Sequence, residues 1–393
     1  MFDFDRLIER RGTHASKWDN MLKLSGIDPA DGLAMWVADM DFAAPEGVVE
    51  ALNTFVDRGT YGYYADTGTW AAALGDWMTK RHGWTPKPEW VSATPGIVSG
   101  LGLIIQALSE PGDEVVVFPP AYHAFRRIIT SNNREILDGE LEERQGRYFM
   151  DLDALGDKLT ERTKIVFFCS PHNPGGTVWT QEEIVALADF CVDRDLILVS
   201  DEIHCDLVFE GAKHIPTIVA APDVADRLIT CVAATKTFNL AGAHVGACVT
   251  SNPDLKKRLD QRIAASGLSS YNAFGMIATE AAWRTGEAWL EALIPYLHGN
   301  RDLLHQGIEA AVPGARAMPL DATYLAWIDF NGTGLAADDV VARVKDTAKI
   351  FASPGPQFGP GGENRLRFNF ATPRPRIEEA VERLGVAFRD LKG

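Results

Sequence analysis

Short apolar runs alternate along the middle of the chain with stretches of helical periodicity. Four runs, each bounded by polar residues or proline, read as buried strands: Val115–Phe118, Lys164–Cys169, Leu196–Val199 and Leu228–Ala233. Gly96 leads into an apolar helical stretch that ends near Leu108. Thr180 and Glu183 form a capping box that opens another helix through about Asp193. Strands that are apolar throughout, alternating with helices, indicate an α/β fold with a mostly parallel sheet covered on both faces.

The two ends of the chain follow other patterns. Residues 17–45 are rich in Trp, Asp and Met with little periodicity, and we expect an ordered arm. A long helical stretch, Glu287–Val312, is expected to be interrupted at Pro295 and to lead into a second unit. Strand-like runs follow at Tyr324–Phe330, Ile350–Ser353 and Arg365–Phe370. We predict a large domain of residues 46–288 and a smaller α+β domain of residues 1–45 and 289–393, with the arm at its start.

One reactive side chain follows each of the four predicted strands: Tyr122, Asn173, Asp201 and Lys236. Ligands of an open parallel sheet bind beyond the carboxyl ends of its strands. Lys236 has apolar neighbours, where a lysine tends to lose its proton, and a Schiff-base nucleophile requires a neutral amine. A buried Asp201 would hold a heterocyclic nitrogen protonated, and the Asn173 amide could donate to a phenolate oxygen.

Each of these residues also has a simpler interpretation. Lys236 could be a solvated surface charge, Asp201 a helix N-cap and Asn173 a turn residue in Asn-Pro-Gly. Taken singly, the residues leave both interpretations open. Their shared position after strand ends favours a common site.

Composition limits the partners of such a site. The chain has 38 Lys and Arg against 54 Asp and Glu, a net charge of −16, which argues against nucleic acid or an acidic membrane as a partner. A small anion can still be held by helix N-termini and a few arginines. We expect a cytoplasmic protein, because no signal peptide or membrane-length apolar stretch is seen. The five cysteines form no CxxC pair and read as core residues, so no disulfide or metal site is predicted.

Three segments together resemble a known family. SPHNPGG (170–176), SDEIH (200–204) and ATKTFNLAG (234–242), with Asn173, Asp201 and Lys236 spaced by 28 and 35 residues, are similar to the motifs of fold-type I pyridoxal-phosphate enzymes, the aspartate aminotransferase superfamily. KWD (17–19), MWVADMDF (35–42), the histidine of DEIH and RLRFNFATPR (365–374) resemble its MalY/PatB-type cystathionine β-lyase subgroup. The resemblance covers nearly the whole chain.

The resemblance implies a role for each residue near the cofactor ring. Lys236 would carry pyridoxal 5'-phosphate as a Schiff base and later move the substrate Cα proton. Asp201 would pair with the pyridinium nitrogen, Asn173 would bond the phenolate oxygen and Tyr122 would stack on the ring. His204 stands where many aminotransferases have a tyrosine, and would support the same oxygen.

The resemblance also implies a phosphate site and a substrate site. The phosphate would lie on Gly96 and Ile97 at a helix N-terminus, with a hydroxyl from Thr235. Tyr63 would reach in from the neighbouring subunit of a homodimer, with ordinary aromatic packing as the alternative. Arg367 would bind the substrate α-carboxylate, with a solvated surface charge as the alternative.

Two positions depart from the family pattern. Position 233 is Ala where many relatives have a phosphate-binding serine, and position 244 is His where aminotransferases commonly have an arginine. These departures weaken an aminotransferase assignment. The implied activity is cleavage of cystathionine or other cysteine S-conjugates to a thiol, pyruvate and ammonia.

Three other functions compete with this one. The alternatives are a class I/II aminotransferase and, from a different class, a non-catalytic ligand-sensing domain. A nicotinamide-dependent enzyme is disfavoured because no GxGxxG follows a first strand.

Overall fold

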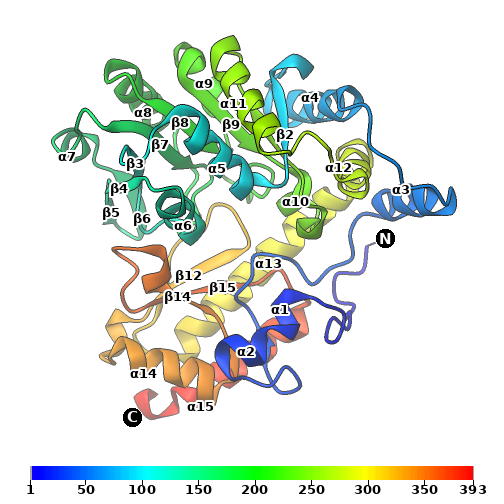
Figure 1. The fold of residues 1–393 in the computed structure, drawn as a ribbon. Helices are drawn as coiled ribbons and strands as arrows, with labels where there is room; N and C mark the ends of the chain where they lie inside the picture. The colour runs from blue at the N-terminus through cyan, green and yellow to red at the C-terminus, as the bar shows by residue number, and fades with distance from the viewer. Residues whose placement is uncertain (1, 393) are drawn as a thin grey trace.

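The computed structural model describes residues 2–392 and places the middle of the chain in an open seven-stranded sheet (Figure 1). The strand order is β2-β10-β9-β8-β7-β3-β4, and all neighbours are parallel except the two pairs that include β10. The strands are β2 (Val91–Thr94), β3 (Glu114–Val117), β4 (Glu135–Asp138), β7 (Thr163–Cys169), β8 (Ile197–Asp201), β9 (Leu228–Val232) and β10 (Gly246–Val249). The predicted mostly parallel sheet is confirmed, with strand ends within two residues of those expected.

Helices cover both faces of this sheet because alternate residues of a strand point to opposite sides. In β3, Val115 and Val117 pack with the helices of one face, and Val116 packs with those of the other. The first face carries α5 (Ile97–Leu108), α6 (His123–Ser131) and α11 (Pro253–Ala265), and the second carries α7 (Leu152–Gly156), α8 (Gln181–Asp193) and α9 (Thr217–Ala220). The predicted capping box opens α8 as expected.

The other elements between residues 46 and 288 surround this sheet. At one end of it, α12 (Ala273–Thr285) packs against α3 (Glu46–Asp57) and α4 (Gly68–His82). A hairpin of β5 (Leu141–Arg144) and β6 (Arg147–Met150) lies apart from the main sheet. Within residues 2–392, no helix is both long and apolar enough to cross a membrane.

The C-terminal part of the chain forms a four-stranded antiparallel sheet in the order β11-β12-β15-β14. Its strands are β11 (Arg316–Ala317), β12 (Leu325–Asp329), β14 (Ser353–Pro354) and β15 (Arg365–Asn369). Its helices are α13 (Glu287–Ala311), α14 (Ala337–Ala342) and α15 (Arg374–Ala387). The long α13 runs from the large domain past this sheet (Figure 1).

Two expectations about this part are wrong in detail. Helix α13 is not interrupted at Pro295, because the one backbone hydrogen bond that proline removes is outweighed by the burial of Leu290, Leu293 and Leu297 on the same helix. The single strand expected at Ile350–Ser353 is two short strands, because the chain changes partners there. The first, β13 (Ile350–Phe351), pairs with the arm, and β14 pairs with β15.

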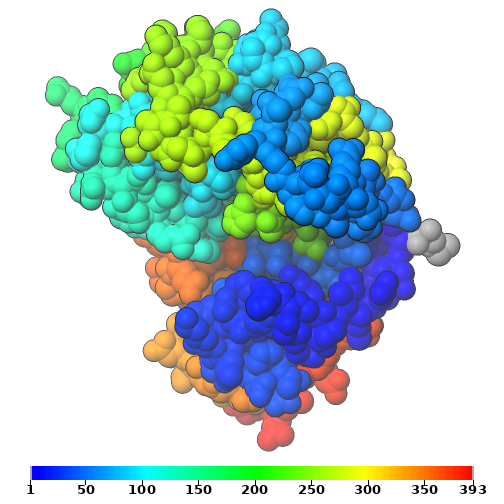
Figure 2. Space-filling model, turned by 45° about the vertical axis from the view of Figure 1, so that its right-hand side comes forward, coloured from blue at the N-terminus to red at the C-terminus, as the bar shows by residue number. Residues whose placement is uncertain are grey.

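The N-terminal arm contains more regular structure than its sequence pattern indicates. It holds α1 (Ser16–Asp19), α2 (Met21–Ser25) and β1 (Leu33–Ala34), which pairs with β13. In the space-filling view the arm, in dark blue, forms the front of the lower half, below a hollow that separates it from the large domain (Figure 2). The division at residues 45 and 288 stays a prediction, since one hydrophobic cluster continues across residue 288 through Trp283 and Trp289.

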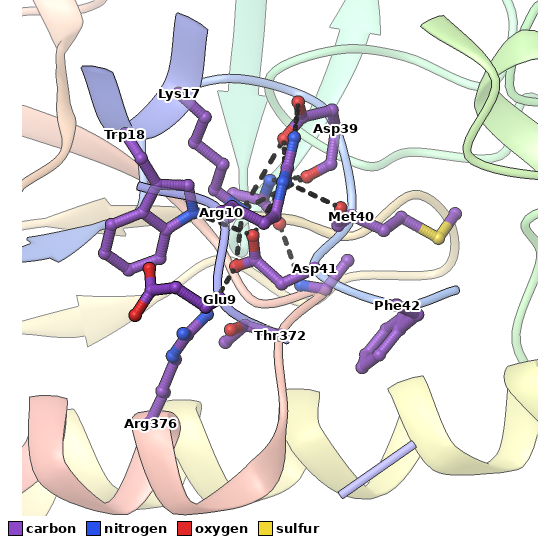
Figure 3. Close-up of polar contacts among 12 residues, drawn as sticks. Glu9, Arg10, Lys17, Trp18, Asp39, Met40, Asp41, Phe42, Thr372 and Arg376 are labelled. Atoms are coloured by element: carbon purple, nitrogen blue, oxygen red, sulfur yellow. Dashed lines mark hydrogen bonds and ion pairs between the residues drawn. The ribbon is translucent and has the colours of Figure 1, made fainter. Parts of the chain in front are cut away.

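A buried ion cluster fixes the arm in this place (Figure 3). The ammonium of Lys17 lies 2.9 Å from Asp41, and both side chains are 0% exposed. Asp41 also accepts hydrogen bonds from Trp18 (3.0 Å) and Arg10 (2.8 Å), and Arg376 of α15 lies 3.3 Å away. Burial alone would raise the pKa of Asp41, but the charges of Lys17 and Arg376 outweigh it and hold that pKa well below its ordinary value.

Candidate active site

A cavity of about 290 Å³ opens where β7, β8 and β9 end and the arm crosses them. Eight of the ten predicted site residues line it: Lys236, Asp201, Asn173, His204, Tyr122, Gly96, Ile97 and Thr235. Arg367 contacts one of these residues from the small domain, and Tyr63 lies elsewhere. Residues that are far apart in the sequence therefore meet at the carboxyl edge of the sheet, as its topology requires.

Lys236 lies on α10 (Ala234–Thr237), a single turn that directly follows β9. Its Nζ donates a hydrogen bond to the backbone carbonyl of Ala38 in the arm at 2.6 Å, and Tyr324 donates to the same oxygen at 2.9 Å. Burial lowers the pKa of Lys236 to about 8. A neutral amine, which nucleophilic attack requires, is therefore accessible near neutral pH.

The arm is held over this lysine by a side chain from the lysine motif itself. Asn239 accepts a hydrogen bond from the backbone N–H of Met40 (2.9 Å) and donates to the carbonyls of Met40 (3.0 Å) and Phe42 (2.8 Å). The segment that carries Ala38 is thus anchored on the large domain by Asn239 and on the small domain by the ion cluster around Asp41. Both anchors keep the Ala38 carbonyl beside Lys236.

Asp201 is the last residue of β8 and is buried. Its carboxylate accepts one hydrogen bond, from the backbone N–H of Ile203 at 3.2 Å. Burial raises the pKa of Asp201 to about 7, and the Ile203 N–H and the charge of Lys236 only partly oppose this. A cationic ring nitrogen placed here would stabilise the ionised carboxylate, because opposite charges attract strongly in a low dielectric.

Arg367, on β15, is a buried guanidinium without an anionic partner among residues 2–392. It donates to the Asn173 Oδ1 atom and to the Trp36 carbonyl, both at 3.0 Å, and its Nε has no hydrogen-bond partner in the described part of the chain. Burial lowers the pKa of Arg367 to about 10. The contact with Arg367 also orients Asn173, whose amide N–H groups stay available to the cavity.

The N-terminus of helix α5 forms another part of the cavity wall. Gly96 caps α5 with a φ of +84°, a left-handed conformation that favours glycine, and it turns the first N–H groups of the helix toward the cavity. Ile97, Ser99 and Thr235 line this end, and so does His244. Free helix N–H groups with neighbouring hydroxyls suit a phosphate. Ser99 was not predicted, although its place in the first turn after Gly96 is a usable signal.

His204 and Tyr122 form further parts of the cavity wall. Burial lowers the pKa of His204 to about 3, so its ring is neutral, and no residue that the structure describes makes a hydrogen bond with its Nδ1. Burial also raises the pKa of Tyr122, which stays a neutral phenol. The sequence does not identify the Ala38 carbonyl or Tyr324 as site groups. A backbone oxygen leaves no signal in the sequence, and Tyr324 falls within a predicted strand.

Tyr63 does not reach the cavity of its own chain. Its side chain is 93% exposed, in a segment without helix or strand between α3 and α4. Its predicted role across a subunit boundary stays a prediction.

The polar groups left incomplete around the cavity fit pyridoxal phosphate. Asp201 suits the ring nitrogen, the Asn173 amide and the neutral His204 suit the phenolate oxygen, and the α5 N-terminus suits the phosphate. Arg367 suits the carboxylate of an amino-acid substrate. Separate polar groups of the site therefore suit the cofactor and the substrate.

Comparison with known proteins agrees with this geometry. The aminotransferase class I and II family model matches residues 31–384, and the chain belongs to that family. The fold is that of the fold-type I pyridoxal-phosphate enzymes, as the resemblance implied.

Particular relatives are lyases by name. The chain is 38% identical over 386 residues to cystathionine beta-lyase PatB of Bacillus subtilis, covering 98% of this chain and 99% of that one. The structure of cystalysin from Treponema denticola, which contains pyridoxal 5'-phosphate, matches with a TM-score of 0.95 at 32% identity over 100% of both chains. The pyridoxal-phosphate-bound C–S lyase of Staphylococcus hominis matches with a TM-score of 0.91 at 30% identity, over 99% of this chain and 98% of that one.

Proposed function

We propose that this chain is a pyridoxal-phosphate-dependent β-lyase that cleaves cystathionine or other cysteine S-conjugates to a thiol, pyruvate and ammonia. The observation that carries the cofactor chemistry is the buried Lys236 amine, which shares one cavity with Asp201, a carboxylate to which no cationic side chain of residues 2–392 is bonded. Full-length similarity to proteins named cystathionine β-lyase and C–S lyase supports elimination as the reaction.

In this proposal, the chain's own residues orient the cofactor. When bound, pyridoxal phosphate supplies an electron sink for negative charge that develops at the substrate Cα. Asp201 keeps a proton on the ring nitrogen, and Asn173 donates to the phenolate oxygen while its Oδ1 stays with Arg367. The Ile97 N–H at the N-terminus of α5 and the Thr235 hydroxyl would hold the phosphate, while Gly96, whose own N–H donates to the Thr94 carbonyl at 2.8 Å, would contribute through the turn it forms. Fewer charged ligands would act there than in relatives with an arginine at position 244.

Other residues act on the substrate. Arg367 binds the α-carboxylate through its guanidinium and so fixes the orientation of Cα. Lys236 removes the Cα proton, for which its lowered pKa suits it. The Ala38 carbonyl and the arm cover Lys236 and limit the entry of water. A thiolate is a good leaving group: it leaves the β-carbon with the electron pair of the C–S bond and takes up a proton to give the thiol. The unsaturated three-carbon amine that remains is released and reacts with water to give pyruvate and ammonia.

The reaction is tested with purified protein, added cofactor and a panel of S-substituted cysteines that includes cystathionine. We expect catalytic release of pyruvate and one thiol per pyruvate, above the rate with free pyridoxal phosphate alone. Absence of pyruvate from every member of the panel would overturn the lyase assignment. Stoichiometric formation of pyridoxamine phosphate, reversed by a keto acid, would identify the aminotransferase alternative.

We also propose a homodimer in which Tyr63 completes the partner's phosphate site. The exposed Tyr63 follows Tyr61 by two residues, and the ring of Tyr61 lies 5.6 Å from that of Phe274 on α12, with both of these rings exposed as well. Burying such a patch against a second copy would stabilise the assembly.

The dimer is tested by complementation. Lys236→Ala and Tyr63→Ala variants, each impaired alone, are mixed under conditions that exchange subunits. Since half of the dimers would then be mixed and each would hold one intact site, activity should recover to about a quarter of wild type. No recovery despite demonstrated exchange, or a monomer by sedimentation, would contradict the role of Tyr63.

A further inference from the structure

A second group of buried polar residues lies behind the cofactor cavity. Asp201 and Lys236 face the cavity, and Thr237, the residue after Lys236, donates a hydrogen bond to Asp206 at 2.8 Å. The same carboxylate accepts from Trp77 Nε1 at 3.1 Å and contacts His82 Nε2 at 2.8 Å. Asp206 thus links the turn that bears the lysine to helix α4, which carries Trp77 and His82.

The carboxylate of Asp206 is buried and fully bonded, in contrast to Asp201. Burial alone would raise the pKa of Asp206. The hydrogen bonds of Asp206 outweigh the effect of burial and lower this pKa, and the bond with His82 contributes most. The possible metal-ligating atoms of His82, Cys205 and Asp206 lie within 4.8 Å of one another. Within this group, His82 and Asp206 are already joined directly by their 2.8 Å contact. The three residues line a separate cavity of about 520 Å³.

The turn that bears Lys236 depends on such anchors. Helix α10 has four residues and no side-chain cap, and an isolated turn is unstable because nucleation costs more than one hydrogen bond returns. Thr237 ties the end of this turn to Asp206 directly. Phe238, the next residue, is fully buried and packs edge-on against Trp77 with ring centroids 5.3 Å apart. Asp206 therefore holds both Thr237 and the indole against which Phe238 packs.

We propose that Asp206 is a positioning residue for the catalytic lysine: held by His82 and Trp77, it fixes Thr237 and so aims Lys236 into the cavity. The inference rests on the proposed function of Lys236 and adds a residue that touches neither cofactor nor substrate. It predicts that the hydroxyl of Thr237 matters for chemistry although it faces away from the cavity.

The test compares three full-length variants. Thr237→Val removes the hydroxyl with little change in shape, and Thr237→Ser keeps it. Thr230→Val is the matched control, because Thr230 on β9 is similarly buried and its hydroxyl makes no hydrogen bond within residues 2–392. Each variant is assayed for kcat and KM, for the pH dependence of cofactor capture after cofactor removal, and for melting temperature.

We expect Thr237→Val to lower kcat by about 10²-fold with little change in KM, as for a misplaced reacting group, and to shift the pH profile of cofactor capture. Thr237→Ser should restore both, and Thr230→Val should match wild type. The losses from Asp206→Asn and Thr237→Val should be less than additive in the double variant, because each single variant already removes the contact between these two side chains.

Equal kcat and equal capture profiles for Thr237→Val and Thr230→Val would overturn the inference, and so would fully additive losses in the double variant. If Asp206→Asn does not fold, the Thr237 series still decides. Failure of wild-type protein to capture pyridoxal phosphate would instead overturn the proposed function, so the two failures are distinguishable.

Discussion

Two buried clusters of charged side chains in this molecule are built in opposite ways. In the arm, Asp41 is surrounded by Lys17, Arg10 and Trp18, and both of its oxygens have partners. In the cavity, Asp201 accepts one backbone hydrogen bond, and Arg367 has no anion in contact within residues 2–392. The carboxylate at the centre of the first cluster has partners on both oxygens, although Arg376 beside it makes an ion pair without a hydrogen bond. The second cluster leaves its carboxylate and its guanidinium without a charged partner among residues 2–392.

This difference separates scaffold from site. A buried polar group without a partner costs about 1–3 kcal/mol, so a folded chain keeps one chiefly where a ligand completes it. The two aspartates show the same contrast in their titration. The pKa of Asp41 is lowered by its cationic neighbours despite burial, and burial raises the pKa of Asp201 to about 7. One residue type thus serves as an arm anchor in one place and as a cofactor ligand in the other.

The largest effect is expected from removing the amine on the site side of the comparison. Lys236→Ala should lower turnover by about 10⁴-fold or more, because the group proposed to bind the cofactor and move the Cα proton is lost. The visible absorbance of the bound cofactor should change with it. Lys164→Ala, at an exposed position on β7, is the control and should behave as wild type. A Lys236→Ala enzyme that kept its turnover would remove this residue from the mechanism.

Paired asparagine substitutions test the comparison itself. Asp41→Asn should destabilise the protein by about 3–5 kcal/mol, because Lys17 and Arg376 lose the carboxylate that they share and the buried Lys17 keeps only the more distant Asp39, at 3.7 Å. Asp201→Asn should not destabilise the cofactor-depleted protein, since the raised pKa of Asp201 means that ionising this carboxylate opposes folding above its ordinary pKa near 4.

Denaturant unfolding with and without cofactor measures both variants. Added pyridoxal phosphate should stabilise wild type and Asp41→Asn, and should stabilise Asp201→Asn much less. If Asp201→Asn proved the more destabilising change without cofactor, the distinction between scaffold and site would not hold.

Lowering the pH should reduce the stability that the cluster around Asp41 contributes. Because the folded-state pKa of Asp41 is depressed, the stability it contributes is present above about pH 4 and is lost as the pH falls through the folded value. The effect is followed by thermal melts between pH 3 and 7 on wild type and Asp41→Asn. The difference in stability between them should narrow at the acid end, and a constant difference would argue against an ionised Asp41 in the arm.

The smallest effect expected is a pH dependence of cofactor capture. Since burial lowers the pKa of Lys236 to about 8, the neutral amine becomes about tenfold more abundant per pH unit below 8 and then levels off. The capture rate of the cofactor-depleted protein should follow this curve. A rate still rising steeply at pH 10 would mean that Lys236 titrates as an ordinary lysine.

The sequence predicted the site side of this comparison better than the arm side. Lys236, Asp201 and Asn173 follow apolar strands, and a parallel sheet brings such strand ends together whatever their separation in the chain. The partners of Asp41 come instead from irregular segments and from α15, whose approach depends on tertiary packing that no periodicity encodes. The sequence also does not predict the Ala38 carbonyl, Tyr324 or the hydrogen bond from Thr237 to Asp206, because these contacts too depend on tertiary packing.

The fold shows the same limit at Pro295. A proline pattern predicts a helix break, and the break does not occur because the apolar face of α13 is buried in the core. Local sequence patterns therefore predicted where the helices and strands lie. At Pro295, the burial of the apolar face of the helix outweighed the local preference of proline for a break.

The central claim, that the incomplete cluster is a pyridoxal-phosphate site built on Lys236, is tested most directly by trapping the cofactor. Purified protein is incubated with pyridoxal phosphate, reduced with borohydride, digested and examined by mass spectrometry. The account predicts one phosphopyridoxyl group per chain, on the peptide that contains Lys236, and much less label in Asp201→Asn. Label spread over surface lysines, or on a single lysine other than Lys236, would contradict it.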